Sequence, residues 1–188
     1  MAGAGVLVIG ACATAGSTLA AWTDDEAAQA SFSSGVFVTT GQVNNGAVQT
    51  TSAQDPKQLS FDTTVTALLP GSYGYSSFTV GTTSASVGGK IVSVTPSGAP
   101  SDTPFTQGIR VIPATPTCSQ TTFDASSTVV VPDGSSLAQG ATASQAIGAA
   151  GGSPVRYCFK VGLPSSAPNS AQGKSATVTW TFSAQAGS

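Results

Sequence analysis

The stretch SATVTWTFSA, residues 175–184, decides the fold class of this chain. Its apolar side chains recur at every second position, with threonine or serine between them. A repeat of two places one set of side chains on each face of an extended strand. An apolar face beside a polar one is typical of a half-buried antiparallel strand. We therefore expect one inward face made of Ala176, Val178, Trp180, Phe182 and Ala184.

Other segments repeat this alternation. In PVRYCFKVGL, residues 154–163, the valines and aromatic residues share one face, and Cys158 lies on the other. We expect Cys158 to lie at a sheet face or edge and to hold a loop against it. QLSFDTTVTALL, residues 58–69, predicts another strand through Leu59, Phe61, Val65 and Ala67. Shorter strands are expected at 35–40, 76–80, 90–95, 108–113 and 128–131. Glycine, proline and asparagine turns separate these segments. The pattern predicts an all-β antiparallel sandwich, with at most one short helix within residues 135–153.

Composition excludes several classes of function. Only 7% of the 188 residues are charged, while 40% are hydrophobic, so the chain can build an apolar core. The six basic residues are scattered and the net charge is -2, which does not favour nucleic-acid binding. The chain has no histidine, which removes histidine acid–base catalysis and most zinc sites. We expect no enzyme activity, no catalytic or metal-binding residue, and no cofactor.

The first segment, residues 1–20, predicts a signal peptide. Residues 2–20 are small and apolar, and Thr18-Leu19-Ala20 has the small residues that a signal peptidase requires. We expect cleavage after Ala20, with Ala21 as the alternative. No lysine or arginine precedes the apolar run, which leaves an uncleaved anchor or a buried helix as a second interpretation. A third is a lipobox, in which Cys12 is acylated.

Export leaves Cys118 and Cys158, which predict a disulfide bond. A pair of cysteines in an exported chain is typically oxidised. A redox or metal-binding role for two cysteines so far apart is the alternative.

The N-terminal region resembles that of the TasA/camelysin family. STLAAWTDDEAAQASFSSGVF, residues 17–37, has small residues, an aromatic residue at Trp22, an acid at Asp24, and Phe-x-x-Gly from Phe32 to Gly35. ALLPGSYGYSSFTVGTTSAS, residues 67–86, and SATVTWTFSAQ, residues 175–185, are similar to two later segments of the family, in the same order. Residues 96–152 show no such match.

The resemblance implies a fold, a location and a partner. The fold is a jelly roll formed by residues 35–188. The protein is secreted after cleavage by a SipW-type signal peptidase and no longer contacts the membrane. It is found at the cell surface or in the biofilm matrix, and its partner is itself, in a head-to-tail fibre. In such fibres the N-terminal strand of one subunit pairs with the sheet of the next. This chain is less charged than the best-known fibre former and adds the expected disulfide.

Residues 21–34 are the candidate donor strand, called the arm below. They contain no proline or glycine, so the arm can pair along its full length. Trp22 and Phe32 lie on the same side of an extended chain, with small residues between them. The acids either discourage self-pairing or meet a base on the partner. The candidate polymerisation residues are Ala21, Trp22, Asp24, Asp25, Glu26, Ala28, Ala30 and Phe32. A solvated tether and a calcium site at the acids are the alternatives.

Two other functions remain open at this point. One is a monomeric adhesin or binding sandwich, for which Tyr73 and Tyr75 could line a surface, although a turn packed on the sandwich explains them as well. The other is a peptidase like camelysin. The chain has no histidine and a single glutamate, Glu26, so it has few side chains that could perform peptidase catalysis.

Overall fold

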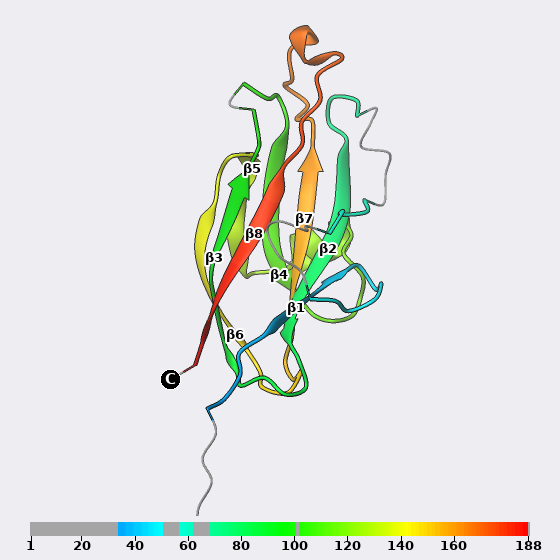
Figure 1. Cartoon of the computed structure of the whole chain (residues 1–188). Helices are drawn as coiled ribbons and strands as arrows, with labels where there is room; N and C mark the ends of the chain where they lie inside the picture. The colour runs from blue at the N-terminus through cyan, green and yellow to red at the C-terminus, as the bar shows by residue number, and fades with distance from the viewer. Residues whose placement is uncertain (1–33, 51–56, 62–67, 101, 188) are drawn as a thin grey trace, which may run out of the picture. The chain divides into compact units, whose positions relative to one another are not determined.

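Two antiparallel β-sheets face each other across an apolar core in the computed structural model (Figure 1). The structure describes residues 34–50, 57–61, 68–100 and 102–187, which belong to one compact unit that begins at Ser34. One sheet has the order β1 (Thr39–Val43), β2 (Tyr73–Thr82), β7 (Val155–Gly162), β4 (Thr106–Ile112), β5 (Val129–Ser136). The other has the order β6 (Ala141–Ile147), β3 (Gly89–Ser97), β8 (Thr179–Ala186). The predicted all-β sandwich is confirmed.

The core between the sheets comes from the alternating apolar positions. Tyr157 and Phe159 of β7 are fully buried, and they face Ile91 and Val94 of β3. Trp180, Phe182 and Ala184 of β8 pack against the same cluster, as the alternation in residues 175–184 predicts. The burial of each large apolar side chain contributes about 1.5–3 kcal/mol, so these strands supply much of the stability of the sandwich.

The strand order is that of a jelly roll with one strand displaced. A jelly roll would order its strands β2-β7-β4-β5 in one sheet and β1-β8-β3-β6 in the other. Both orders are present except that β1 pairs with β2, in register from Thr39 opposite Thr82 to Val43 opposite Phe78. Among the described residues, β8 pairs with β3 alone. The place beside β8 that a jelly roll fills with a strand is therefore vacant in the described part of the chain.

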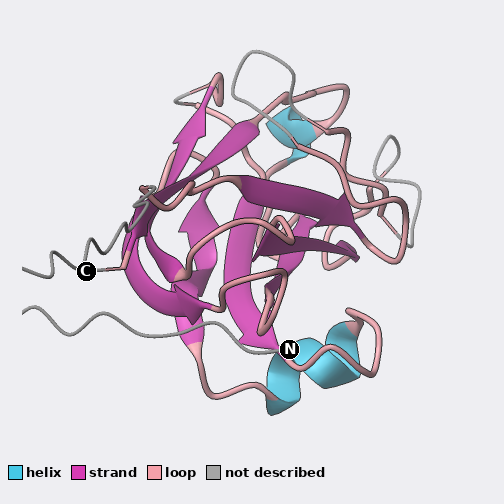
Figure 2. Ribbon diagram, turned by 60° about the horizontal axis from the view of Figure 1, so that its bottom comes forward, coloured by secondary structure: helices cyan, strands magenta, loops and turns pink. Residues whose placement is uncertain are grey.

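A short helix covers the outer face of the five-stranded sheet. Helix α1 (Gln120–Ala125) begins with a capping box between Ser119 and Thr122, and it buries Phe123 against Tyr75 and Ile112. A 3₁₀ turn, η1 (Asn169–Ala171), precedes β8. Figure 2 shows the helical segments outside the two sheets.

Three expectations need correction. Residues 135–153 contain no helix, and residues 141–147 form β6 instead. No strand includes residues 57–61 or 68–69, whereas residues 62–67 lie outside the described part. Cys158 does lie on the face opposite Phe159, but it is fully buried on a central strand, because α1 and its flanking loop form a second small core over it.

Candidate functional site: an apolar groove beside β8

The vacant edge of β8 borders a groove between the two sheets. The groove has a volume of about 520 Å³ and follows the chain from Lys174 to Phe182. Its apolar lining residues come from both sheets and from the segments beside them: Leu59, Phe61, Leu68, Phe78, Val80, Phe105, Phe159, Val161, Ala176, Val178, Trp180 and Phe182. Because this lining continues the core, a strand placed beside β8 would close the sandwich and bury it.

The back of the groove is a cluster of aromatic rings. The Trp180 ring lies 5.0 Å from that of Phe159, and the Phe182 ring lies 4.6 Å from that of Tyr157 and 5.3 Å from that of Phe78, measured between centroids. Trp180 and Phe182 remain partly accessible although they pack against the core. Packed aromatic pairs are rigid and bury large areas, so the groove offers a preformed apolar surface.

Residues 57–61 form one side of the groove without joining a sheet. Leu59 and Phe61 point into the apolar cluster, and the intervening Ser60 is exposed. Asn44, which has a left-handed backbone (φ 49°), donates its side-chain N–H to the Ser60 carbonyl over 2.8 Å. The Oδ1 of Asn44 accepts from the Ser77 backbone N–H over 2.8 Å, which fixes this wall to β2.

The charged residues in the described lining of the groove are lysines. Lys57 and Lys174 contribute to its lining, and among the described lining residues there is no carboxylate. The described acids, Asp102, Asp124 and Asp133, lie elsewhere in the fold. The groove is therefore suited to an apolar, extended segment.

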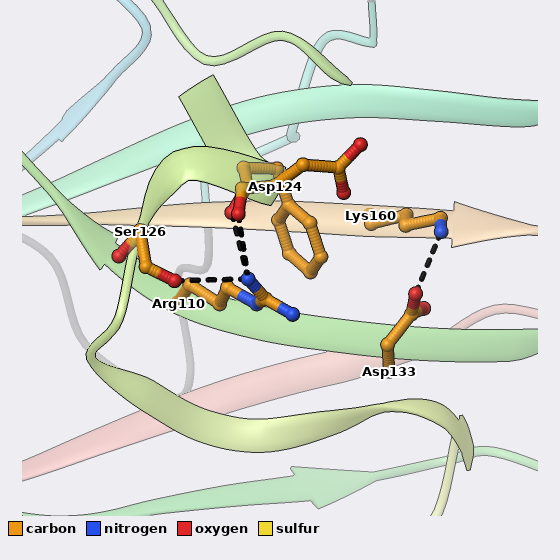
Figure 3. Close-up of polar contacts among 6 residues, drawn as sticks. Arg110, Asp124, Ser126, Asp133 and Lys160 are labelled. Carbon is orange, nitrogen blue, oxygen red and sulfur yellow. Dashed lines mark hydrogen bonds and ion pairs between the residues drawn. The ribbon is translucent and has the colours of Figure 1, made fainter. Parts of the chain in front are cut away.

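The remaining ordered polar groups serve the fold (Figure 3). Arg110 donates to the carbonyls of Phe123 and Ser126 over 3.0 and 2.9 Å, and its guanidinium lies 4.6 Å from the centre of the Phe123 ring. Lys160 contacts Asp133 over 2.7 Å and lies above the Tyr73 ring. Both cations bind groups that hold α1 and β5 on the sheet, and the buried Nε of Arg110 has no hydrogen-bond partner in the described part of the chain.

The predicted site residues have different outcomes. The disulfide Cys118–Cys158 is present, with its Cα atoms 5.4 Å apart. Both tyrosines lie on β2 and not in a turn: Tyr75 is buried against Phe123, and Tyr73 packs beneath Lys160, so neither lines an open surface. The polymerisation residues and the cleavage positions, from Ala20 to Phe32, lie outside the described residues.

The sequence alone did not identify the groove. Its lining residues were expected as ordinary core, because an alternating strand shows which face is apolar and not whether a neighbouring strand covers it. One signal was present in Leu59 and Phe61, whose alternation predicts an apolar face beside the sheets. That one edge of β8 has no neighbouring strand among the described residues depends on strand order, which arises from contacts far apart in the chain.

Neither a membrane span nor a metal cluster is found in the described part of the chain. None of its helices is long and apolar enough to cross a bilayer. Its cysteine and aspartate side chains form no group of three or more that could hold a metal ion. The chain matches no family model, no curated protein and no solved structure.

Proposed function

We propose that this chain is the secreted subunit of an extracellular fibre at the cell surface or in the biofilm matrix, in which the arm of one copy fills the groove of the next. The observation that carries the proposal is the strand position beside β8, above an apolar groove, which no strand of the described residues fills. A donor strand supplies what this edge lacks, namely backbone hydrogen-bond partners for β8 and apolar side chains for the groove.

The arm has the side chains that such a groove requires. Trp22 and Phe32 share one face of the extended arm, with Ala28 and Ala30 between them. Burial of each aromatic ring contributes about 2–3 kcal/mol. The contact is heterologous, because the arm leaves one copy and docks at a different place on another. Contacts of this kind do not close, and they produce filaments.

Charge also favours the arm as the occupant. The arm contains Asp24, Asp25 and Glu26 and no basic residue. The groove contributes Lys57 and Lys174 and, among its described residues, no acid. The described groove lining therefore presents no carboxylate that would repel the acids of the arm. The resemblance of residues 17–37 to the TasA/camelysin family is independent support.

The test uses the mature chain that begins at Ala21. A double variant, Trp22→Ser with Phe32→Ser, removes both large side chains from the inward face of the arm. The matched control, Thr23→Ser with Ser31→Ala, changes two positions on its outward face. We expect the control to form fibres in negative-stain images and the inward variant to remain monomeric in size-exclusion chromatography. A chain that begins at Gly35 should also remain monomeric.

Two results would contradict the proposal. If the inward variant or the chain from Gly35 still forms fibres, the arm is not the donor strand. If the unaltered mature chain is monomeric at every concentration tested, the alternative of a monomeric adhesin, which binds an apolar strand of another protein in its groove, is favoured instead.

A further inference from the structure

The chain enters the sandwich at the pole where β8 ends. The carbonyl of Val36 accepts from the Val87 N–H over 2.9 Å, and the Phe37 ring lies against Gly89. Gly89 is paired with Ala186, the last residue of β8, and Gly187 donates to the Gly88 carbonyl over 2.9 Å. Figure 1 shows the start of the described chain, in blue, at the same end as the C-terminus. The described chain therefore begins at this pole, which is called the exit pole below.

The groove extends from the level of Thr39 and Val80 to the pole opposite the exit pole. Its lining along β8 begins at Lys174 and Ala176, before the strand starts, and includes Leu68 and Phe105. The ladder of β8 pairs Thr179 with Ser97 at that end and Ala186 with Gly89 at the exit pole. β8 thus runs toward the exit pole, whereas β1 runs away from it, from Thr39 opposite Thr82 to Val43 opposite Phe78.

These directions distinguish an arm in its own groove from the arm of another copy. If the arm filled the groove of its own copy, its N-to-C direction would be toward the exit pole, and hence parallel to β8. If the arm instead continues past the exit pole into the groove of a second copy related by translation, its N-to-C direction is away from the exit pole, and hence antiparallel to β8. On the basis of the proposed function, we infer that the arm docks in a second copy antiparallel to β8, with Phe32 near Lys174 and Trp22 near the end of β8.

The pairing preferences of the fold agree with this direction. Every strand pair in the two described sheets is antiparallel. A parallel pair is slightly less stable per residue, so insertion into the own groove gains less than exchange. Length is also compatible, because the extended arm spans about 33 Å from Trp22 to Phe32, and the groove edge from Lys174 to Phe182 spans about 26 Å.

Chemical cross-linking of the mature chain tests the direction. Four double-cysteine variants each combine one arm position, Thr23→Cys or Ser31→Cys, with one β8-edge position, Thr177→Cys or Ser183→Cys. On β8 and the segment before it, Thr177 and Ser183 are exposed and alternate with the apolar positions, and Thr177 lies at the rim of the groove. Thr177 and Ser183 lie about 20 Å apart along an extended strand, so a bismaleimide that spans about 10 Å separates the two directions even if the register shifts by two residues. Cys118 and Cys158 are bonded to each other and do not react.

The antiparallel arrangement predicts covalent ladders on denaturing gels for Thr23→Cys with Ser183→Cys and for Ser31→Cys with Thr177→Cys, and loss of the ladder for the other two combinations. The reverse set of ladders would overturn the direction while leaving the fibre proposal intact. Fibres without any ladder would show that the arm does not lie beside β8, which overturns the inference. Cross-links confined to single chains, with no fibres in images, would overturn the proposed function itself.

Discussion

The indole N–H of Trp180 donates to the Oε1 of Gln107 over 2.8 Å, and this hydrogen bond joins β8 of one sheet to β4 of the other. Gln107 is almost completely buried, and its Nε2 donates to the carbonyls of Ser136 and Gln139 over 2.9 Å each. The amide therefore uses both its donor group and its acceptor. Trp180 lines the groove, so this network fixes the orientation of the groove's back wall.

Trp180→Phe is expected to lower the free energy of unfolding by about 1–3 kcal/mol, because it leaves the buried Oε1 of Gln107 without its donor. Urea denaturation followed by circular dichroism measures the change. An unaltered midpoint and slope would show that Gln107 finds another donor and that the hydrogen bond between the sheets is dispensable.

Tyr157→Phe is the matched comparison and is expected not to destabilise the protein at neutral pH. The Tyr157 hydroxyl is buried and has no hydrogen-bond partner in the described part of the chain. Removing an unpaired polar group while keeping the ring is neutral or stabilising, by up to about 1 kcal/mol. A loss as large as that of Trp180→Phe, in the same urea experiment, would mean that the hydroxyl is hydrogen-bonded.

The same tyrosine predicts a loss of stability in alkali. Burial raises the pKa of the Tyr157 hydroxyl in the folded protein above its ordinary value. Because the folded state disfavours the phenolate, this group does not affect stability below the ordinary tyrosine pKa of about 10 and lowers the free energy of unfolding as pH rises above it. Urea titrations between neutral pH and about pH 11 should show a smaller loss for Tyr157→Phe than for the unaltered chain. Equal losses would assign the effect to other groups.

Removing the disulfide is expected to cost about 2–4 kcal/mol. Cys118 and Cys158 are 40 residues apart, and closing a loop of that length restricts the unfolded chain. The double variant Cys118→Ala with Cys158→Ala should unfold at lower urea, and so should the unaltered protein in a reductant. The reductant should have no effect on the double variant. If the unaltered protein is equally stable when reduced, the bond does not contribute.

Arg110→Ala is expected to destabilise the protein by about 2 kcal/mol, because charged donors to the carbonyls at the end of α1 are lost together with the contact on Phe123. Lys90→Ala, at an exposed position on β3, is the control and should change stability by less than about 0.5 kcal/mol. Thermal unfolding compares the two. Similar effects for both would assign the loss to net charge.

The sequence predicts the strands whose two faces differ in polarity. In β8, threonine and serine alternate with large apolar residues, and the predicted inward face is the observed one. The strand β6 has the sequence ATASQAI, in which small residues lie on both faces, so no clear period distinguished it from a helix. Its β-structure comes from pairing with β3 in the folded protein.

Other features depend on contacts that no local pattern encodes. Cys158 follows the predicted alternation, yet it is buried because α1 covers its face. Helix α1 was not predicted, since QTTFDA is short and contains few strong helix formers. Residues 57–61 have the alternation of a strand and lack its hydrogen-bonded ladder. The groove depends on which strand is missing beside β8, a property of the topology as a whole.

The place of β1 has a consequence for any stack of these subunits. Because β1 begins at the exit pole while the groove opens at the opposite pole, an arm donated antiparallel always points the same way along the stack. A finite filament would then keep one empty groove at one end and one undocked arm at the other, however long it grew. Growth and capping would be separate events at two chemically different tips, and a free peptide with the arm's sequence would block one tip and leave the other active.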